Sequence, residues 1–268
     1  MKNKMMKRTL SLVLAVMTVL SVMVVSVGTA SAATGDVNYN LEFKTAGSQG
    51  TTNGDVVITV HGTAGSTSAH NVGEVGDSQK LQTASFTDVN VGEITGVTVD
   101  VISGINDGWY PEYINVSTST DTETIYCGRW VDDGKKVTMN VTDTVLKVQV
   151  VTGDVTYAGT NGDVKIRFKD TNNKQTTTFA NLSSIHPDSD AFERKDDSTF
   201  YVYAGADFGA VKSIEILSGG DGIFGFGADW YLYSITITNV SGFSQGASCT
   251  KVIDQWLEDG HGVYKFSF

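Results

Sequence analysis

The chain has 268 residues, of which 30 are acidic and 19 are basic, so its formal net charge is −11. This balance excludes a typical nucleic-acid-binding protein, which would carry a basic surface. Only two cysteines are present, too few for a scaffold held together by disulfides. A composition rich in Gly, Thr and Val with only two Pro predicts an all-β protein.

Residues 1–32 are predicted to be a signal peptide. Four basic residues precede an apolar run from Leu10 to Val27, and Ala30-Ser31-Ala32 supplies a small-residue cleavage site. The run is long, so an uncleaved membrane anchor is the alternative. Without this segment the chain keeps 15 basic and 30 acidic residues, a net charge of −15. We therefore expect a strongly acidic protein that is secreted or extracellular.

The rest of the chain contains an internal repeat. Three motifs recur in the same order, and together they include all four Trp residues. They are TNGDV at 52–56 and 160–164, DGWY at 107–110 with ADWY at 228–231, and WVDDG at 130–134 with WLEDG at 256–260. Such a long period predicts two homologous domains and not a solenoid. We place the first module at 36–142 and the second at 143–268.

Alternating Val- and Thr-rich runs predict seven strands in each module. In the first module they are 39–45, 55–61, 80–86, 95–102, 111–117, 122–127 and 136–141. In the second they are 145–151, 163–169, 176–180, 199–203, 211–217, 231–238 and 261–268. Strands of this number and length predict two antiparallel β-sandwich modules. The spacing in CTKVIDQWL predicts a helical turn before Trp256.

The second module resembles the PLAT/LH2 domain of lipoxygenases, lipases and polycystins, a C2-like β-sandwich. The resemblance lies in the segments 148–168, 192–202, 217–237 and 256–260. The first module has the same skeleton but lacks the TGD and FER segments, so its membership depends on the repeat. TNGDV stands where the family usually carries a Thr-Asp-Ala-Asn-Val turn. The resemblance implies docking on membrane lipid or on a lipid-associated protein, assisted by Ca²⁺.

Oxygen-bearing side chains in the Gly-rich loops are the candidate Ca²⁺ ligands, because Ca²⁺ takes six to eight oxygen ligands. The resemblance places calcium loops in these regions. In the second module the candidates are Asp154, Asn161, Asp163, Asp197 and Asp229, with Asp196 and Asp221 beside them. In the first module they are Asp55 and Asp107, with Asn53 and Asn106. The alternative is that these residues only form turns, which Asp and Asn favour.

The segment GGDGIFGFGADW at 219–230 predicts a protruding apolar loop. Ile223, Phe224 and Phe226 lie among glycines, which is unlike a sandwich strand, and exposed aromatic residues on loops are usually interaction sites. The resemblance implies that this loop enters a bilayer beside Ca²⁺. The alternative is that both Phe side chains fold back over the core.

Two other functions compete with lipid docking. An extracellular carbohydrate- or protein-binding adhesin would also be an exported β-sandwich, although we expect the Trp residues in the core. An esterase would use Ser244 in GFSQG, with Asp254 or Asp259 and His261. That motif requires a strand–turn–helix element, which the pattern does not predict. We therefore expect a non-catalytic binding protein with no small-molecule substrate, and Cys127 and Cys249 in separate cores.

Overall fold

The computed structural model describes residues 35–47, 50–77, 81–102, 108–186, 192–219 and 229–268. All described residues belong to one compact unit, Ala32–Phe268. Within the described ranges, no helix is long and apolar enough to cross a membrane.

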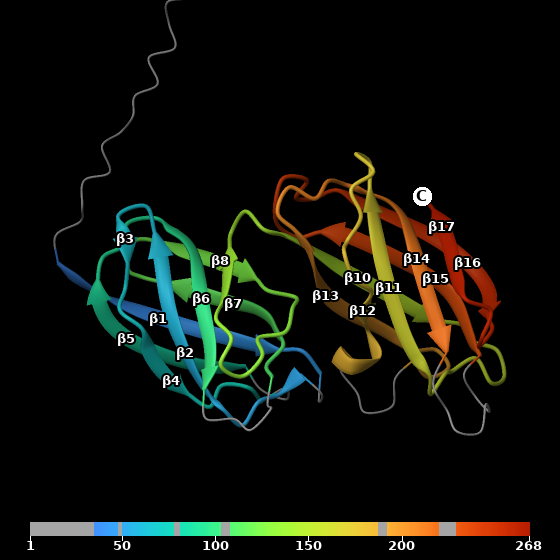
Figure 1. Ribbon diagram of the computed structural model, residues 1–268, viewed down its shortest axis with the longest axis horizontal. Helices are drawn as coiled ribbons and strands as arrows, with labels where there is room; N and C mark the ends of the chain where they lie inside the picture. The colour runs from blue at the N-terminus through green and yellow to red at the C-terminus, as the bar shows by residue number, and fades with distance from the viewer. Residues whose placement is uncertain (1–34, 48–49, 78–80, 103–107, 187–191, 220–228) are drawn as a thin grey trace, which may run out of the picture. The chain divides into compact units, whose positions relative to one another are not determined.

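Four antiparallel sheets make up the described part of the chain, so the prediction of an all-β fold with two sandwich modules is confirmed (Figure 1). The strands of the first sandwich are β1 (Asp36–Thr45), β2 (Asp55–Gly62), β3 (Gly65–Ser66), β4 (His70–Gly73), β5 (Gln82–Val89), β6 (Ile94–Ile102), β7 (Pro111–Ser117), β8 (Thr122–Tyr126) and β9 (Val137–Asn140). Those of the second are β10 (Thr144–Thr152), β11 (Asp163–Asp170), β12 (Ala180–Asn181), β13 (Asp197–Gly205), β14 (Val211–Gly219), β15 (Trp230–Asn239), β16 (Ser248–Leu257) and β17 (Val263–Ser267), with a short 3₁₀ helix, η2 (Ser183–Ile185).

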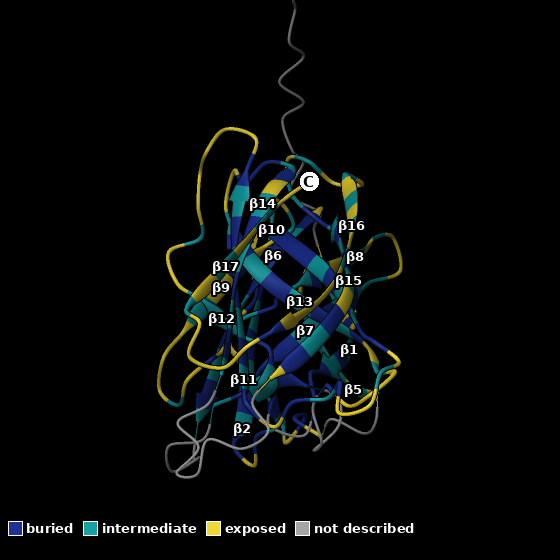
Figure 2. Ribbon diagram, turned by 90° about the vertical axis from the view of Figure 1, so that its right-hand side faces the viewer, coloured by how far each residue is buried: buried dark blue, intermediate teal, exposed yellow. Residues whose placement is uncertain are grey.

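Alternation of apolar and polar residues explains why these segments are strands. Successive side chains of a strand point to opposite faces, and β2 and β11 both alternate between buried and partly exposed residues. Figure 2 shows the same alternation along the central strands. The buried residues form two hydrophobic clusters, one lying in the first sandwich and one mainly in the second. Cys127 belongs to the first cluster and Cys249 packs against the second, and both are free thiols.

The two sandwiches share one strand order. One sheet of the first runs β5-β1-β7-β8, and its counterpart in the second runs β13-β10-β15-β16. The facing sheets run β3-β2-β6-β9, with β4 also paired to β2, and β12-β11-β14-β17. Strands β1 and β10, β7 and β15, and β8 and β16 are therefore equivalent positions in the two sandwiches.

The repeated TNGDV motif forms the same turn twice. In the first copy the backbone N–H of Gly54 donates to Oγ1 of Thr52 at 3.0 Å, and in the second the N–H of Gly162 donates to Oγ1 of Thr160 at 3.0 Å. Both threonines are buried, and the Asp of each motif begins the next strand. The motif therefore connects a turn to β2 in one copy and to β11 in the other.

The first Trp of each repeat also makes the same interior bond. Nε1 of Trp109 donates to Oγ1 of Thr45 at 2.8 Å, and Nε1 of Trp230 donates to Oγ1 of Thr152 at 2.9 Å. All four side chains are buried. A buried indole N–H needs a partner, and in both copies that partner is the last residue of the neighbouring central strand.

The prediction that all four Trp residues are core residues is wrong for the second Trp of each repeat. Trp130 is 37% exposed and Trp256 is 39% exposed. Each contacts a tyrosine edge to face: the ring centroids are 5.3 Å apart for Tyr110 and Trp130, and 5.2 Å apart for Tyr231 and Trp256. The repeat reflects a shared architecture at these positions, but each indole lies on the surface beside a tyrosine.

The predicted helical turn before Trp256 is also wrong, because Ser248–Leu257 is the strand β16. Val252 and Trp256 are exposed, whereas Ile253 packs against the core and Leu257 is buried. A spacing of four residues fits one face of a helix, but it is also a multiple of the two-residue period of a strand. The positive φ of 52° at Asp254 and a register shift on β15 locally disturb the alternation.

Residues of the first sandwich also bond to strand β13. The hydroxyl of Tyr110 donates to the carbonyl oxygens of Gly128 and Tyr201 at 2.7 and 2.9 Å. The N–H of Tyr203 donates to the carbonyl oxygen of Gly128 at 2.7 Å, and the guanidinium of Arg129 lies 4.1 Å from the centre of the Tyr203 ring. Burial raises the pKa of the Tyr201 phenol to about 12. The residues that follow β8 are therefore hydrogen-bonded to the second sandwich.

Candidate functional site

The predicted calcium-binding residues of the second sandwich lie at one end of it. Strands β10, β14 and β16 end there, and β11, β13, β15 and β17 begin there, as their pairing registers show. This end, which we call the loop end, comprises the connections 153–162, 186–196, 220–229 and 258–262. Asp154, Asn161, Asp163, Asp197 and Asp229 all belong to these connections or to the first residue of the strand that follows.

Asp154 forms ion pairs at the loop end. Its Oδ1 accepts a hydrogen bond from Nε of Arg194 at 2.7 Å, and its Oδ2 lies 3.0 Å from Nζ of Lys195. The hydrogen bonds from Arg194 and Lys195 hold the pKa of Asp154 below its ordinary value. The side chains of all three residues are about half exposed or more. The carboxylate is therefore ionised and already paired with two cations.

The other predicted ligands of the second sandwich have separate partners. Oδ2 of Asp163 is 2.9 Å from Nζ of Lys165. The carboxylate of Asp197 accepts a hydrogen bond from Nε2 of Gln149 at 2.9 Å. Oδ1 of Asp229 accepts a hydrogen bond from the N–H of Asp259 at 2.9 Å, and Oδ2 of Asp196 accepts one from the hydroxyl of Ser198 at 2.8 Å. Asn161 is exposed.

No group of three His, Cys, Asp or Glu residues that could hold a metal ion occurs in the part of the chain that the structure describes. The chemistry of the donors at the loop end suits Ca²⁺, since they are carboxylates and an amide. The structure brings them to one end of the sandwich but does not make them converge within the described residues. Asp221 lies outside those residues.

In the first sandwich, Asp55 begins β2, and its Oδ2 accepts a hydrogen bond from Nδ2 of Asn71 at 3.0 Å. Asn53 is exposed in the preceding turn. Asn106 and Asp107 lie outside the described residues, so two of the four candidate ligands of this sandwich have a described position.

Ile223, Phe224 and Phe226, the predicted apolar loop, also lie outside the described residues. Another aromatic residue at the loop end was missed by the sequence analysis. Tyr157 is 88% exposed and has a φ of 64°, which is uncommon for a residue other than glycine. The signal for it was a single aromatic residue in the polar, turn-forming segment TGDVTYAGTNGD.

The geometry around Ser244 does not form a nucleophile elbow. Ser244 lies in the hairpin between the antiparallel strands β15 and β16, and no helix follows it. His261 comes after β16, whose ten residues place it about 30 Å farther along the strand. Oδ1 of Asp254 is bonded to the hydroxyl of Tyr231 and not to a histidine. The Ser244, Asp254 and His261 side chains therefore cannot act as a triad.

An antiparallel β-sandwich with an acidic loop end is the class of domain that these observations define. The family model described as PLAT/LH2 domain matches residues 146–266, which confirms the resemblance for the second sandwich. The match covers less than half of the chain, and it begins in β10 and ends in β17.

Solved structures of lipoxygenases resemble part of the chain. A lipoxygenase variant crystallised anaerobically with arachidonate is 23% identical, with a TM-score of 0.38, over 46% of this chain and 16% of that one. Coral 8R-lipoxygenase, described with calcium activation through a C2-like domain, is 19% identical, with a TM-score of 0.36, over 40% of this chain and 17% of that one. The chain thus corresponds to about one sixth of these structures. No curated protein matched the sequence.

Proposed function

We propose that this is an exported, non-catalytic binding protein whose second sandwich docks on membrane lipid or on a lipid-associated protein. The observation that carries the proposal is the PLAT/LH2 match over residues 146–266. The signal-peptide pattern of residues 1–32 supports export. Ser244 lacks the geometry of a nucleophile, which removes the one catalytic motif suggested by the sequence.

The chemistry of the loop end suits a membrane interface. Tyr157 presents an exposed aromatic ring there, and Tyr residues are favoured where a membrane meets water. Arg194 and Lys195 are exposed cations at the same end of the sandwich that can contact acidic headgroups. The sequence prediction for Phe224 and Phe226 adds two apolar residues to the same end of the sandwich.

We propose that Ca²⁺ assists this docking, with Asp154 and Asp229 among the residues that would hold it. Bound Ca²⁺ would supply positive charge between an acidic protein and anionic headgroups. The calcium activation described for coral 8R-lipoxygenase belongs to that enzyme, and for this chain calcium is part of the proposal.

Vesicle co-sedimentation tests lipid docking. We expect the protein to sediment with vesicles of phosphatidylcholine and phosphatidylserine in Ca²⁺, and less so in EGTA. Tyr157→Ser should weaken sedimentation. Phe243→Ser is the matched control, because Phe243 is 84% exposed in the β15–β16 hairpin at the opposite end of the same sandwich. Equal losses for both variants, or no sedimentation with any vesicle, would overturn the lipid proposal.

Thermal melting during a Ca²⁺ titration tests the metal separately. We expect Ca²⁺ to raise the Tm of the unchanged protein and to raise that of Asp229→Asn less, because the variant loses a charged ligand. Asn keeps an oxygen that can accept the hydrogen bond from Asp259. Asp207→Asn, on an exposed residue at the opposite end, is the control. A Tm that does not change with Ca²⁺ would remove calcium from the proposal and leave the vesicle result to decide the rest.

A further inference from the structure

The outer face of the sheet β5-β1-β7-β8 carries two rows of polar side chains. Neighbouring strands pair so that outward-pointing residues lie directly side by side. The first row across the four strands is Thr83, Glu42, Asn115 and Thr124. The second row is Ser85, Asn40, Ser117 and Thr122. The intervening residues, such as Phe43 and Ile114, point into the core.

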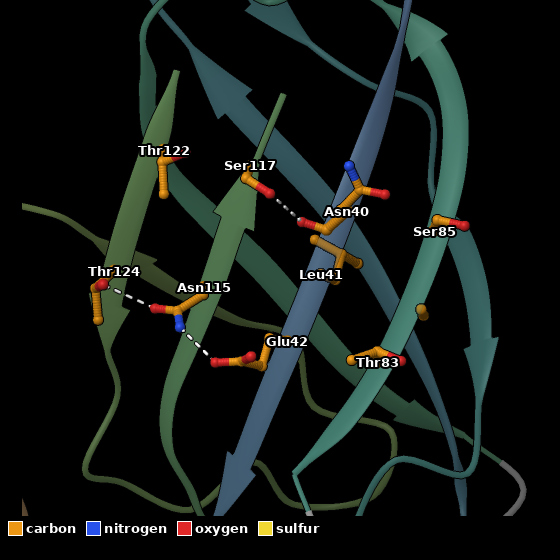
Figure 3. A pocket seen from close by; sticks show the side chains of 10 residues that line it. Asn40, Leu41, Glu42, Thr83, Ser85, Asn115, Ser117, Thr122 and Thr124 are labelled. Atoms are coloured by element: carbon orange, nitrogen blue, oxygen red, sulfur yellow. Dashed lines mark hydrogen bonds between the residues drawn. The ribbon is translucent and has the colours of Figure 1, made fainter. Parts of the chain in front are cut away.

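These rows line a hollow of ≈ 580 Å³ (Figure 3). Its size lies within the range of small-molecule sites, about 300–1,000 Å³. The lining consists of hydroxyls, amides and one carboxylate, with only Leu41 and Ala84 as apolar residues. The hollow therefore offers many hydrogen-bonding groups and few wholly apolar side chains.

A chain of hydrogen bonds fixes the side chains at its centre. Oγ1 of Thr124 donates to Oδ1 of Asn115 at 2.7 Å, and Nδ2 of Asn115 donates to Oε1 of Glu42 at 2.7 Å (Figure 3). The second N–H of the Asn115 amide and the second oxygen of Glu42 keep hydrogen-bonding capacity. An amide donor and a carboxylate acceptor are thus held side by side, as needed to bind two neighbouring hydroxyls of one ligand.

The charge of the hollow excludes anionic ligands. Glu42 is the only ionisable side chain that lines it, and the whole chain carries a net charge of −11. A phosphate or sulfate would be repelled by Glu42 and would find no lining cation. The hydroxyls of Thr83, Ser85 and Thr122 have no side-chain partner in the part of the chain that the structure describes. A neutral ligand with many hydroxyls avoids repulsion by Glu42 and can form hydrogen bonds with these three side chains.

A pair of tyrosines continues the same face. The next row, two residues along the strands and about 7 Å away, contains Lys44, Tyr113 and Tyr126. The ring centroids of Tyr113 and Tyr126 are 6.2 Å apart. Aromatic rings are amphipathic and can contact the apolar face of a sugar ring. Tyr126 also stacks on Tyr201 of the second sandwich, with ring centroids 5.6 Å apart. A ligand that extends beyond the hollow along β7 would therefore meet Tyr113.

We propose that this hollow binds a neutral oligosaccharide segment of a polysaccharide chain, with Glu42 and Asn115 bonding to sugar hydroxyls and Tyr113 contacting the adjoining ring. The site lies on the first sandwich and is independent of the lipid docking proposed for the second. The protein would then hold a glycan through one sandwich and a lipid surface through the other.

Titration calorimetry of the whole chain with cellohexaose, xylohexaose, mannohexaose and chitohexaose tests the site. We expect one or more of these to bind, and Asn115→Ala and Glu42→Gln each to lose about tenfold in affinity. Thr236→Ala is the matched control, because Thr236 occupies the position of Asn115 in the equivalent strand β15, and it should leave binding unchanged.

Ser85→Lys provides a variant that should fold, because Ser85 is exposed and has no side-chain partner to lose in the described structure. Its longer side chain should enter the hollow and weaken binding, while its Tm stays close to that of the unchanged protein. Absence of binding to all four oligosaccharides would overturn the proposal. So would binding that Asn115→Ala, Glu42→Gln and Ser85→Lys leave unchanged, or retention only on vesicles that contain a neutral galactolipid.

Discussion

The buried bond between Trp230 and Thr152 should contribute measurably to the stability of the second sandwich. Trp230→Phe removes the indole N–H that donates to Oγ1 of Thr152 at 2.9 Å. A hydrogen bond of this kind is worth about 0.5–1.5 kcal/mol net. The smaller ring adds a packing loss, because Trp230 is 1% exposed. Thr152→Val removes the acceptor and leaves a buried N–H without its partner, which costs about 1–3 kcal/mol.

A double-mutant cycle isolates the bond from the packing loss. The variants are Trp230→Phe, Thr152→Val and their combination, and their unfolding by urea is followed by far-UV circular dichroism. We expect the double variant to be about 1–2 kcal/mol more stable than the sum of the single effects predicts, since it leaves no unpaired N–H. In a chain of this size each kcal/mol lowers Tm by about 2–4 °C.

The first sandwich supplies the control for this cycle. Trp230→Phe combined with Thr45→Val joins two side chains that are not partners, so their effects should add to within about 0.5 kcal/mol. The cycle on Trp109 and Thr45 should give a coupling similar to that of Trp230 and Thr152. A coupling energy near zero for the true pairs would refute the view that this bond holds the interior of each sandwich.

Three further outcomes follow from the structure. Burial raises the pKa of Glu112 from 4.5 to about 7, so the folded state binds this proton more tightly than the unfolded state does. The free energy of unfolding should therefore fall as pH rises from about 4.5 through 7. Urea titrations at several pH values should show this fall in the unchanged protein and not in Glu112→Gln. Gly128→Ala should lower Tm more than Gly134→Ala, although both glycines have positive φ. A Cβ at Gly128 would lie 2.8 Å from the backbone nitrogen of Tyr203, whereas a Cβ at Gly134 would meet nothing within 4 Å. Burial raises the pKa of both thiols, that of Cys249 to about 11. A disulfide reagent at pH 8 should therefore label Cys249 slowly and the more buried Cys127 more slowly still. Peptide mapping of the labelled protein would show this order.

Alternation along single strands made much of the fold predictable from the sequence. The segment at 55–61 is rich in Val and Ile and follows a turn, so its strand followed from the sequence. Its buried face did not, because Val56, Val57 and Ile58 are consecutive apolar residues and only the structure shows that their burial alternates. β16 was missed because Val252 and Trp256, and likewise Ile253 and Leu257, are spaced by four residues, a spacing common to helices and strands. The positive φ of 52° at Asp254 also disturbs the alternation in the middle of this strand.

The candidate sites were predictable to different degrees. Asp154 and Asp229 were expected in neighbouring loops, and they do lie at one end of the second sandwich. The ion pairs of Asp154 with Arg194 and Lys195 join residues about forty positions apart, so no local pattern indicates them. The hollow on the outer face of the sheet β5-β1-β7-β8 was equally unpredictable from local sequence, because Glu42 and Asn115 become neighbours only through the pairing of β1 with β7.

The indole bond just before β7 and at the start of β15 has a consequence for how new binding specificities can arise in this protein. It fixes the first residues of each strand immediately after a connection of different length in the two copies. Six residues (103–108) precede Trp109 in one copy, and ten (220–229) precede Trp230 in the other. Because the strand is fixed from within, the connection can change in length and sequence without changing the register of the sheet. That position is therefore a natural place to graft foreign recognition loops, and the second copy already accommodates four more residues there than the first.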